Sequence, residues 1–251
     1  MMGQMMRQLA KVCIAALGAC LLNATALAAT YTPVALPALN ADIGTYTGGA
    51  TYATEFPADA GTLTVTYNGV PFRTARDASG NNAYIDPFFS GDLVLSTSVF
   101  GATQVYTLIS SAYGIATVNN GAVTFAGTGG ALYSVNLIQG QNIRDHFDGG
   151  YNNVIDGSSA VPGFNPGPGQ ARLDMQIFNL PAIFASLRLT SITFSGNSSS
   201  QNLVGGVPFM VAATVLDPST VAAVPEPAEY ALLLAGLVMV AGMARRRAQA
   251  H

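Results

Sequence analysis

Short runs of alternating apolar and polar residues dominate the chain between residues 62 and 215. Residues 62–67 form one such run, and Asn68-Gly69 after it provides the two positive-φ positions of a tight hairpin turn. Pro71 lies in the returning run and lacks a backbone N–H, so we expect that strand at a sheet edge. Further strands are predicted over residues 92–100, 104–109, 122–126, 131–138, 172–178, 187–194 and 207–215.

Helical periodicity is lacking in the same region, apart from one predicted turn around residues 181–185. Residues 29–59 are interrupted by proline and glycine, and we expect one or two edge strands there. Residues 156–169 are rich in Gly, Ser and Pro and are the longest predicted loop. Many short strands separated by such turns predict an all-β fold, a single β-sandwich over residues 29–216. A short linker, 217–224, follows it.

The first 28 residues have the three parts of a secretory signal peptide. Arg7 and Lys11 supply the positive charge, residues 12–22 are apolar, and Ala26-Leu27-Ala28 is a small-residue cleavage motif. We therefore predict a signal-peptide helix, export across the inner membrane by the Sec translocon, and cleavage by signal peptidase between Ala28 and Ala29.

Both cysteines, Cys13 and Cys20, lie within this leader. Residues 17–20 can also be interpreted as a lipobox that would make Cys20 a lipidated N-terminus, although the apolar stretch before it would be very short. Cleavage before Ala29 leaves a chain without thiols. Such a chain forms no disulfide, no Cys-ligated metal site and no Cys nucleophile.

The tripeptide Pro225-Glu226-Pro227 introduces a second apolar segment. Residues 230–244 are fifteen positions without charge, followed by Arg245-Arg246-Arg247. A helix is stable in lipid because it bonds every backbone group internally. At about 1.5 Å per residue this transmembrane helix spans about 22 Å, less than the roughly 30 Å hydrocarbon core. The arginines favour the cytoplasmic side.

This order of parts, from Val224 to about Arg247, resembles the PEP-CTERM sorting signal of Gram-negative bacteria. The resemblance implies processing by an exosortase, an integral-membrane transpeptidase, with transient anchoring in the inner membrane. It also implies delivery to the cell surface or the exopolysaccharide matrix. An ordinary tail anchor behind a proline-rich linker is the alternative. The residues of the signal are Pro225, Glu226, Pro227, Arg245, Arg246 and Arg247.

Charge excludes one class of function. Residues 29–224 contain eleven acidic and five basic residues and no lysine, a net charge of about −6. Nucleic-acid binding needs a basic surface and is therefore excluded. The high hydrophobic content excludes disorder. A surface built from Thr, Ser, Asn, Gln and Gly fits an extracellular adhesive or matrix protein better than a cytosolic enzyme.

Catalytic motifs do not emerge from the sequence, and we predict a non-enzymatic protein without catalytic residues. His146 is the only histidine of residues 29–224, and neither H-E-x-x-H nor G-x-S-x-G occurs. A secreted glycan-active hydrolase is the alternative, with His146 beside Asp145 or Asp148. We favour instead an exposed histidine in a polar loop.

Residues 141–156 are the most polar stretch of the chain and allow three interpretations. Carboxylate and amide oxygens suited to a structural calcium ion come from Asp145, Asp148, Asn152 and Asp156. A sugar-binding ledge would use Arg144, His146 and Tyr151, together with Asp145. In the third interpretation the stretch is a loop capped by its own Asx side chains, with Arg144 paired to Asp145 or Asp174. No cofactor other than this calcium ion is predicted.

The strand spacing, with segments 106–114 and 142–147, loosely resembles the jelly rolls of galactose-binding-like domains and carbohydrate-binding modules. The resemblance implies a carbohydrate-binding module as the alternative function and polysaccharide as a partner. No binding residue is carried over from it. Aromatic candidates for stacking on sugars are Tyr31, Tyr46, Tyr52, Phe88 and Phe89, of which we expect the two phenylalanines in the core.

Overall fold

The computed structural model describes residues 30–46, 52, 54–147, 149, 151–167, 169–198, 205–217 and 237. Residues Ala29–Thr220 form one compact unit. The predicted signal peptide lies outside the described residues, as does the sorting signal except for Leu237. Among the described residues, no helix has the length and apolar character needed to cross a membrane.

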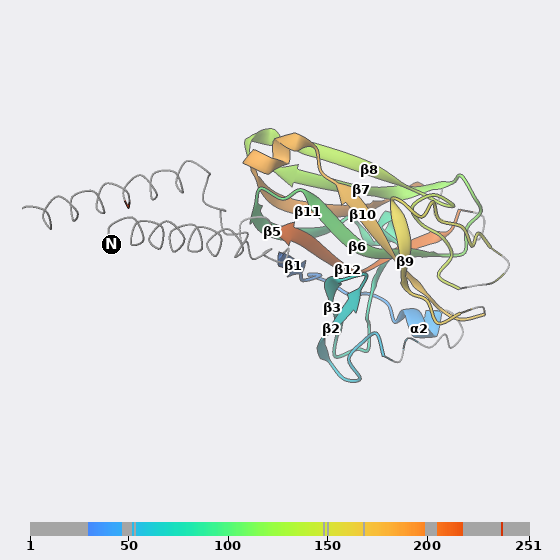
Figure 1. Ribbon diagram of the computed structural model, residues 1–251. Coiled ribbons are helices and arrows are strands. Elements are labelled where there is room, and N and C mark those ends of the chain that lie inside the picture. The colour runs from blue at the N-terminus through green and yellow to red at the C-terminus, as the bar shows by residue number, and fades with distance from the viewer. Residues whose placement is uncertain are drawn as a thin grey trace, which may run out of the picture. The chain divides into compact units, whose positions relative to one another are not determined.

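Twelve strands and four single-turn helices make up the described part of this unit (Figure 1). The strands are β1 (Thr30–Val34), β2 (Gly61–Tyr67), β3 (Val70–Arg76), β4 (Tyr84–Ile85), β5 (Leu93–Phe100), β6 (Gln104–Ala112), β7 (Asn119–Gly127), β8 (Leu132–Ile138), β9 (Ala160–Phe164), β10 (Leu173–Asn179), β11 (Arg188–Gly196) and β12 (Val207–Asp217). The helices are α2 (Ile43–Tyr46), α3 (Pro87–Ser90), η1 (Thr128–Gly130) and η2 (Ala182–Ser186).

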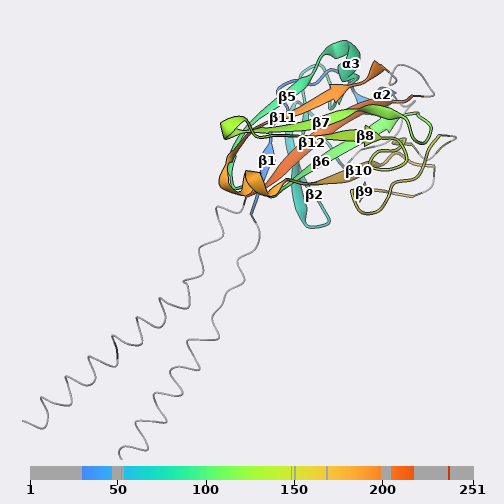
Figure 2. The ribbon, with the colours of Figure 1, turned by 90° about the horizontal axis from the view of Figure 1, so that it is seen from above.

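Two antiparallel sheets carry the fold (Figure 1, Figure 2). One runs in the order β1-β12-β6-β10-β9, with β4 added beside β12, and the other in the order β5-β11-β7-β8. Every ladder between these strands is antiparallel. The prediction of an all-β, sandwich-like fold is confirmed at this level.

The main core lies between the two sheets. The four-stranded sheet contributes Leu95, Phe125 and Phe194, and the six-stranded sheet contributes Ile109 and Phe178, all less than 5% exposed. Burial of large apolar side chains contributes roughly 1.5–3 kcal/mol each relative to an exposed position. This core can therefore stabilise the fold without disulfides.

A second core covers the opposite face of the six-stranded sheet. Phe72 of the β2–β3 hairpin packs there with Leu108, Leu173 and Phe209, all fully buried. The Thr214 hydroxyl donates to the Pro71 carbonyl at 2.7 Å and fastens the hairpin to β12. Strands buried on both faces lose the polar alternation of half-exposed strands, which explains the nearly continuous burial of β6.

The predicted hairpin is confirmed. Residues 61–67 pair with 70–76 in register, and the turn residues Asn68 and Gly69 have φ values of 50° and 81°. Pro71 pairs with β2 alone, and its carbonyl accepts from Thr214 of β12, so its missing N–H lies on the side away from β2 and costs no ladder hydrogen bond. The predicted helical turn at 181–185 corresponds to η2.

Three predictions of local structure were wrong. The loop predicted at 156–169 contains β9, an edge strand in which Pro162 needs no amide hydrogen because only β10 pairs with it. The single turn at 181–185 is not the only helical segment, since α2 and α3 also form. Phe88 and Phe89 are 41% and 67% exposed on α3 rather than in the core. Their helix begins at Pro87, directly after Asp86, whose backbone is left-handed (φ 55°).

Candidate functional site

The loop between β8 and β9, residues 139–159, lies against the end of the six-stranded sheet. The amide of His146 donates to the Ser111 carbonyl at 2.8 Å, and the Ser111 amide donates to the Arg144 carbonyl at 3.0 Å. The amide of Arg172 donates to the His146 carbonyl at 2.7 Å. Residues 144–146 are thereby held between the end of β6 and the segment that leads into β10.

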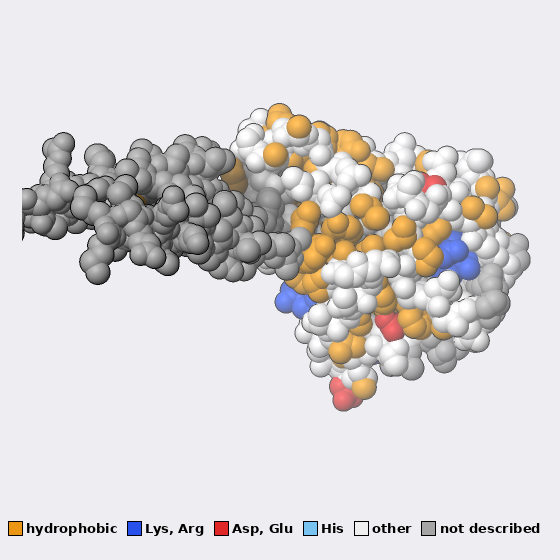
Figure 3. Space-filling model, viewed as in Figure 1, with side chains coloured by type: hydrophobic (Ala, Val, Ile, Leu, Met, Phe, Trp, Pro, Cys, Tyr) orange, Lys and Arg blue, Asp and Glu red, His pale blue; other side chains and the backbone are white. Residues whose placement is uncertain are grey.

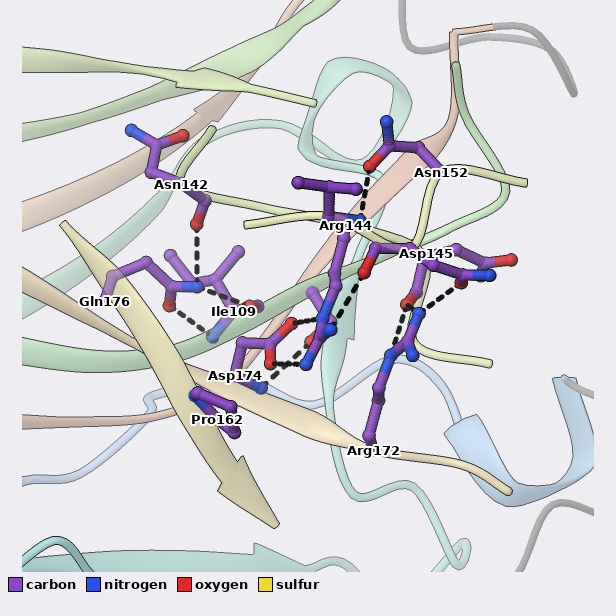
Figure 4. Close-up of polar contacts among 12 residues, drawn as sticks. Ile109, Asn142, Arg144, Asp145, Asn152, Pro162, Arg172, Asp174 and Gln176 are labelled. Atoms are coloured by element: carbon purple, nitrogen blue, oxygen red, sulfur yellow. Dashed lines mark hydrogen bonds and ion pairs between the residues drawn. The ribbon is translucent and has the colours of Figure 1, made fainter. Parts of the chain in front are cut away.

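A buried ion pair joins this loop to β10 (Figure 4). The Nε and Nη2 atoms of Arg144 donate to the two carboxylate oxygens of Asp174 at 2.8 and 2.7 Å. Its Nη1 donates to the Asn153 carbonyl at 2.9 Å. Burial raises the pKa of Asp174, and the guanidinium of Arg144 acts against that rise. Of the two predicted partners of Arg144, the structure therefore selects Asp174.

Arg172 provides a second attachment for the same loop. Its Nε and Nη2 atoms donate to the Asp145 carbonyl at 3.0 and 2.9 Å, and Nη2 also bonds the Asn153 side chain. The charges of Arg144 and Arg172 are balanced by Asp145 and Asp174, and all four residues are less than 9% exposed. Buried charges that are paired and hydrogen-bonded in this way fix a loop in one position.

Gln176 completes what we call the loop anchor, the set Arg144, Asp145, His146, Arg172, Asp174 and Gln176. Its Oε1 accepts bonds from the Ile109 amide (2.8 Å) and the Thr107 hydroxyl (3.0 Å). Its Nε2 donates to the carbonyls of Ile109 (2.8 Å) and Asn142 (3.0 Å). Gln176 was not among the residues predicted from the sequence. The signal was its spacing from Asp174, which places two polar residues on one face of an otherwise apolar strand.

His146 is buried, and the prediction of an exposed histidine was wrong. The side chain is 1% exposed and packs edge-on against Phe209, with ring centroids 5.0 Å apart. Its Nδ1 lies 2.5 Å from the hydroxyl of Tyr52, whose ring is stacked at 14°. Burial, with the charge of Arg172, lowers the pKa of His146 to about 3. Burial also raises the pKa of Tyr52 well above its usual value. Both rings are therefore neutral at pH 7.

The described members of the predicted calcium site accept hydrogen bonds from backbone amides. Asp145 accepts from the amides of Tyr113 and Phe147, and Asn152 accepts from that of Val154. Asp156 accepts from the amides of residues 158–160 and from the Ser159 hydroxyl. Burial raises the pKa of Asp156, but these hydrogen bonds outweigh that effect and lower the pKa to about 2. Asp148 lies outside the described residues. Within those residues, no group of three His, Cys, Asp or Glu is placed to hold a metal ion.

The proposed sugar-binding ledge is divided between the interior and the surface. Arg144 and His146 are buried, at 8% and 1% exposure. Tyr151 is half-buried and packs edge-on against Tyr113, with centroids 5.2 Å apart. Tyr52, another candidate for sugar stacking, is 5% exposed and belongs to the second core. The arrangement can anchor a loop, and it places a neutral histidine out of reach of solvent.

Comparison with known proteins does not extend these observations, since neither protein-family models nor curated protein sequences match the chain.

Proposed function

We propose that this chain is an exported, non-enzymatic protein of the cell surface or exopolysaccharide matrix, sorted by an exosortase through residues 225–247. The observation that carries the proposal is the order of three parts: the Pro225-Glu226-Pro227 tripeptide, a fifteen-residue uncharged segment and three consecutive arginines. Each part has a physical role, since the prolines keep the chain extended, the apolar run enters the bilayer, and the arginines hold its far end in the cytoplasm.

The compact unit is suited to such an export. It has two cores on either side of one sheet, and both cysteines of the chain lie in the predicted leader. Its stability therefore depends on apolar burial and on the loop anchor, and not on an oxidising compartment. We take its two-sheet arrangement to be a jelly-roll-like sandwich, whose rigid strands would present loops to the exterior.

The loop anchor favours a structural role over a hydrolytic one. A general base needs access to substrate and a pKa near the working pH. His146 is buried and has a pKa of about 3. Asp174 is fully buried in its pair with Arg144. These groups serve the fold, which supports the non-enzymatic proposal.

The proposal is tested by expressing the chain in a bacterium that carries an exosortase and fractionating its membranes, surface and medium. The unaltered chain should be released in a shortened form. Glu226→Ala, or deletion of residues 245–247, should leave a longer form in the inner membrane. Matched controls are Glu229→Ala, which removes a carboxylate outside the Pro225-Glu226-Pro227 tripeptide, and deletion of residues 249–251, which removes three residues beyond the arginines. Release of the Glu226→Ala and arginine-deletion variants at the level of their controls would refute the proposal.

A further inference from the structure

A shallow groove of about 500 Å³ lies between β1 and β5, the outer strands at one edge of the two sheets. Its lining combines hydroxyl groups, one aromatic ring and one cation: Thr32, Ser96, Thr97, Ser98, Phe100 and Arg188. Ligand sites commonly measure roughly 300–1,000 Å³ and carry a few polar groups among apolar ones. The groove is large enough for one or two sugar rings.

Arg188 stands out because charged side chains are sparse on this protein, as the face in Figure 3 illustrates. Arg76 lies 3.8 Å from Asp42, and Arg144 and Arg172 are used in the loop anchor. The side chain of Arg188 is exposed, and its Nη1 donates to the Ser98 carbonyl and to the Ser98 hydroxyl (3.1 Å). In the described part of the chain its guanidinium makes no ion pair with a carboxylate.

The two remaining nitrogens of Arg188, Nε and Nη2, are the same atoms through which another arginine of this protein binds a carboxylate. Arg144 binds both oxygens of Asp174 through Nε and Nη2. In Arg188 the bonds from Nη1 to Ser98 hold the guanidinium in place, and Nε and Nη2 have no partner among the described residues. A planar guanidinium edge matches a carboxylate with two parallel hydrogen bonds.

Phe100 provides the second element of recognition. It is 50% exposed and is the direct cross-strand partner of Arg188 in the β5–β11 ladder. Cross-strand partners lie about 4.5–5.5 Å apart at Cβ. An exposed ring beside a guanidinium presents a flat apolar surface next to a carboxylate-binding edge. The hydroxyls of Ser96 and Ser98 are on the same strand.

We propose that this groove binds a carboxylated sugar, a uronic acid unit of an extracellular polysaccharide. The inference rests on the proposed function, which places the protein among such polymers. The sugar ring lies on Phe100, its carboxylate accepts from Nε and Nη2 of Arg188, and the hydroxyl side chains bond the hydroxyl groups of the sugar. The domain as a whole is acidic and repels polyanions, so this interaction depends on Arg188 rather than on a general positive field.

Calorimetric titration of the compact unit, Ala29–Thr220, tests this site. The probes are oligogalacturonate, oligomannuronate and the same oligomers after reduction of their carboxyl groups. At least one uronate should bind, and reduction should weaken that binding at least about tenfold, the equivalent of one charged hydrogen-bond pair. Arg188→Gln should weaken it by a similar factor. Arg73→Gln, which removes an exposed arginine outside the groove, should leave it within about twofold.

Equal binding of the acid and reduced oligomers, no binding of either uronate, or unchanged binding by Arg188→Gln would each overturn the proposal. Thermal unfolding checks that both variants are folded. If Arg188→Gln were unfolded, NMR titration of the unaltered unit would decide, since uronate should shift the amide signals of residues 96–100. Sorting is not involved in these measurements, so failure here would refute the groove and leave the fractionation test of the sorting signal standing.

Discussion

Mild acid should destabilise the compact unit, Ala29–Thr220, because its single histidine is buried and uncharged. Burial and the charge of Arg172 lower the pKa of His146 from 6.5 to about 3. In the unfolded chain the ring takes up a proton below about pH 6.5, whereas in the folded chain it stays neutral until about pH 3. The unfolded state therefore binds more protons across this window, and stability falls as the pH falls.

The magnitude follows from these two pKa values. Between pH 7 and pH 5, His146 should lower the free energy of unfolding by about 2 kcal/mol. The total decrease caused by this residue should reach about 5 kcal/mol once the pH is below 3. Asp145 and Asp174 act in the opposite sense near pH 4, because burial raises the pKa of each and their protonation then favours the folded state. The pKa of Tyr52 is raised further above its usual value near 10, so Tyr52 does not titrate in this window.

Urea unfolding of the unit at pH 7, 6 and 5 measures this effect. The His146→Gln variant keeps a polar side chain beside Tyr52 but cannot titrate, so only the pH dependence of its stability is compared. The unaltered unit should lose about 2 kcal/mol more than the variant between pH 7 and pH 5. An equal loss in both proteins would refute the buried, neutral state of His146.

Three further substitutions test the packing around the loop anchor and α3. Asp174→Asn leaves Arg144 buried without its counter-ion and should lower the free energy of unfolding, measured in urea, by about 3–5 kcal/mol. A decrease below about 1 kcal/mol would contradict a desolvated ion pair. Gln176→Leu should cost about 1–3 kcal/mol and speed amide hydrogen exchange in residues 139–159, and unchanged exchange there would count against the anchor. Gly196→Ala places a Cβ 2.3 Å from the amide nitrogen of Phe88, so it should cost about 1–3 kcal/mol, and full stability would show that α3 does not pack there.

Strand positions followed from the sequence wherever one face of the strand was apolar. The hairpin was predictable because its turn residues have a conformational requirement that Asn68-Gly69 meets. β9 was not predictable, because Pro162 lowers the strand propensity of this segment and a proline is tolerated there only at the edge of the sheet. β6 is buried on both faces, so the sequence pattern predicted residues 104–109 and missed the end of the strand at Ala112.

The loop anchor depends on contacts between residues far apart in the chain. The burial of His146 requires Tyr52, 94 positions away, and Phe209. The polar residues beside His146 in the sequence predicted an exposed side chain instead. Arg144 was predicted to pair with Asp145 or Asp174, and only the position of β10 beside the loop selects Asp174. Residues of this kind are fixed by tertiary packing, which a local pattern does not record.

Mass spectrometry of both ends of the protein recovered from outside its native cells tests the central proposal most directly. We expect a chain that begins at Ala29 and lacks residues 230–251. A surface or matrix protein that retains this segment, or a full-length chain found only in the inner membrane, would contradict it.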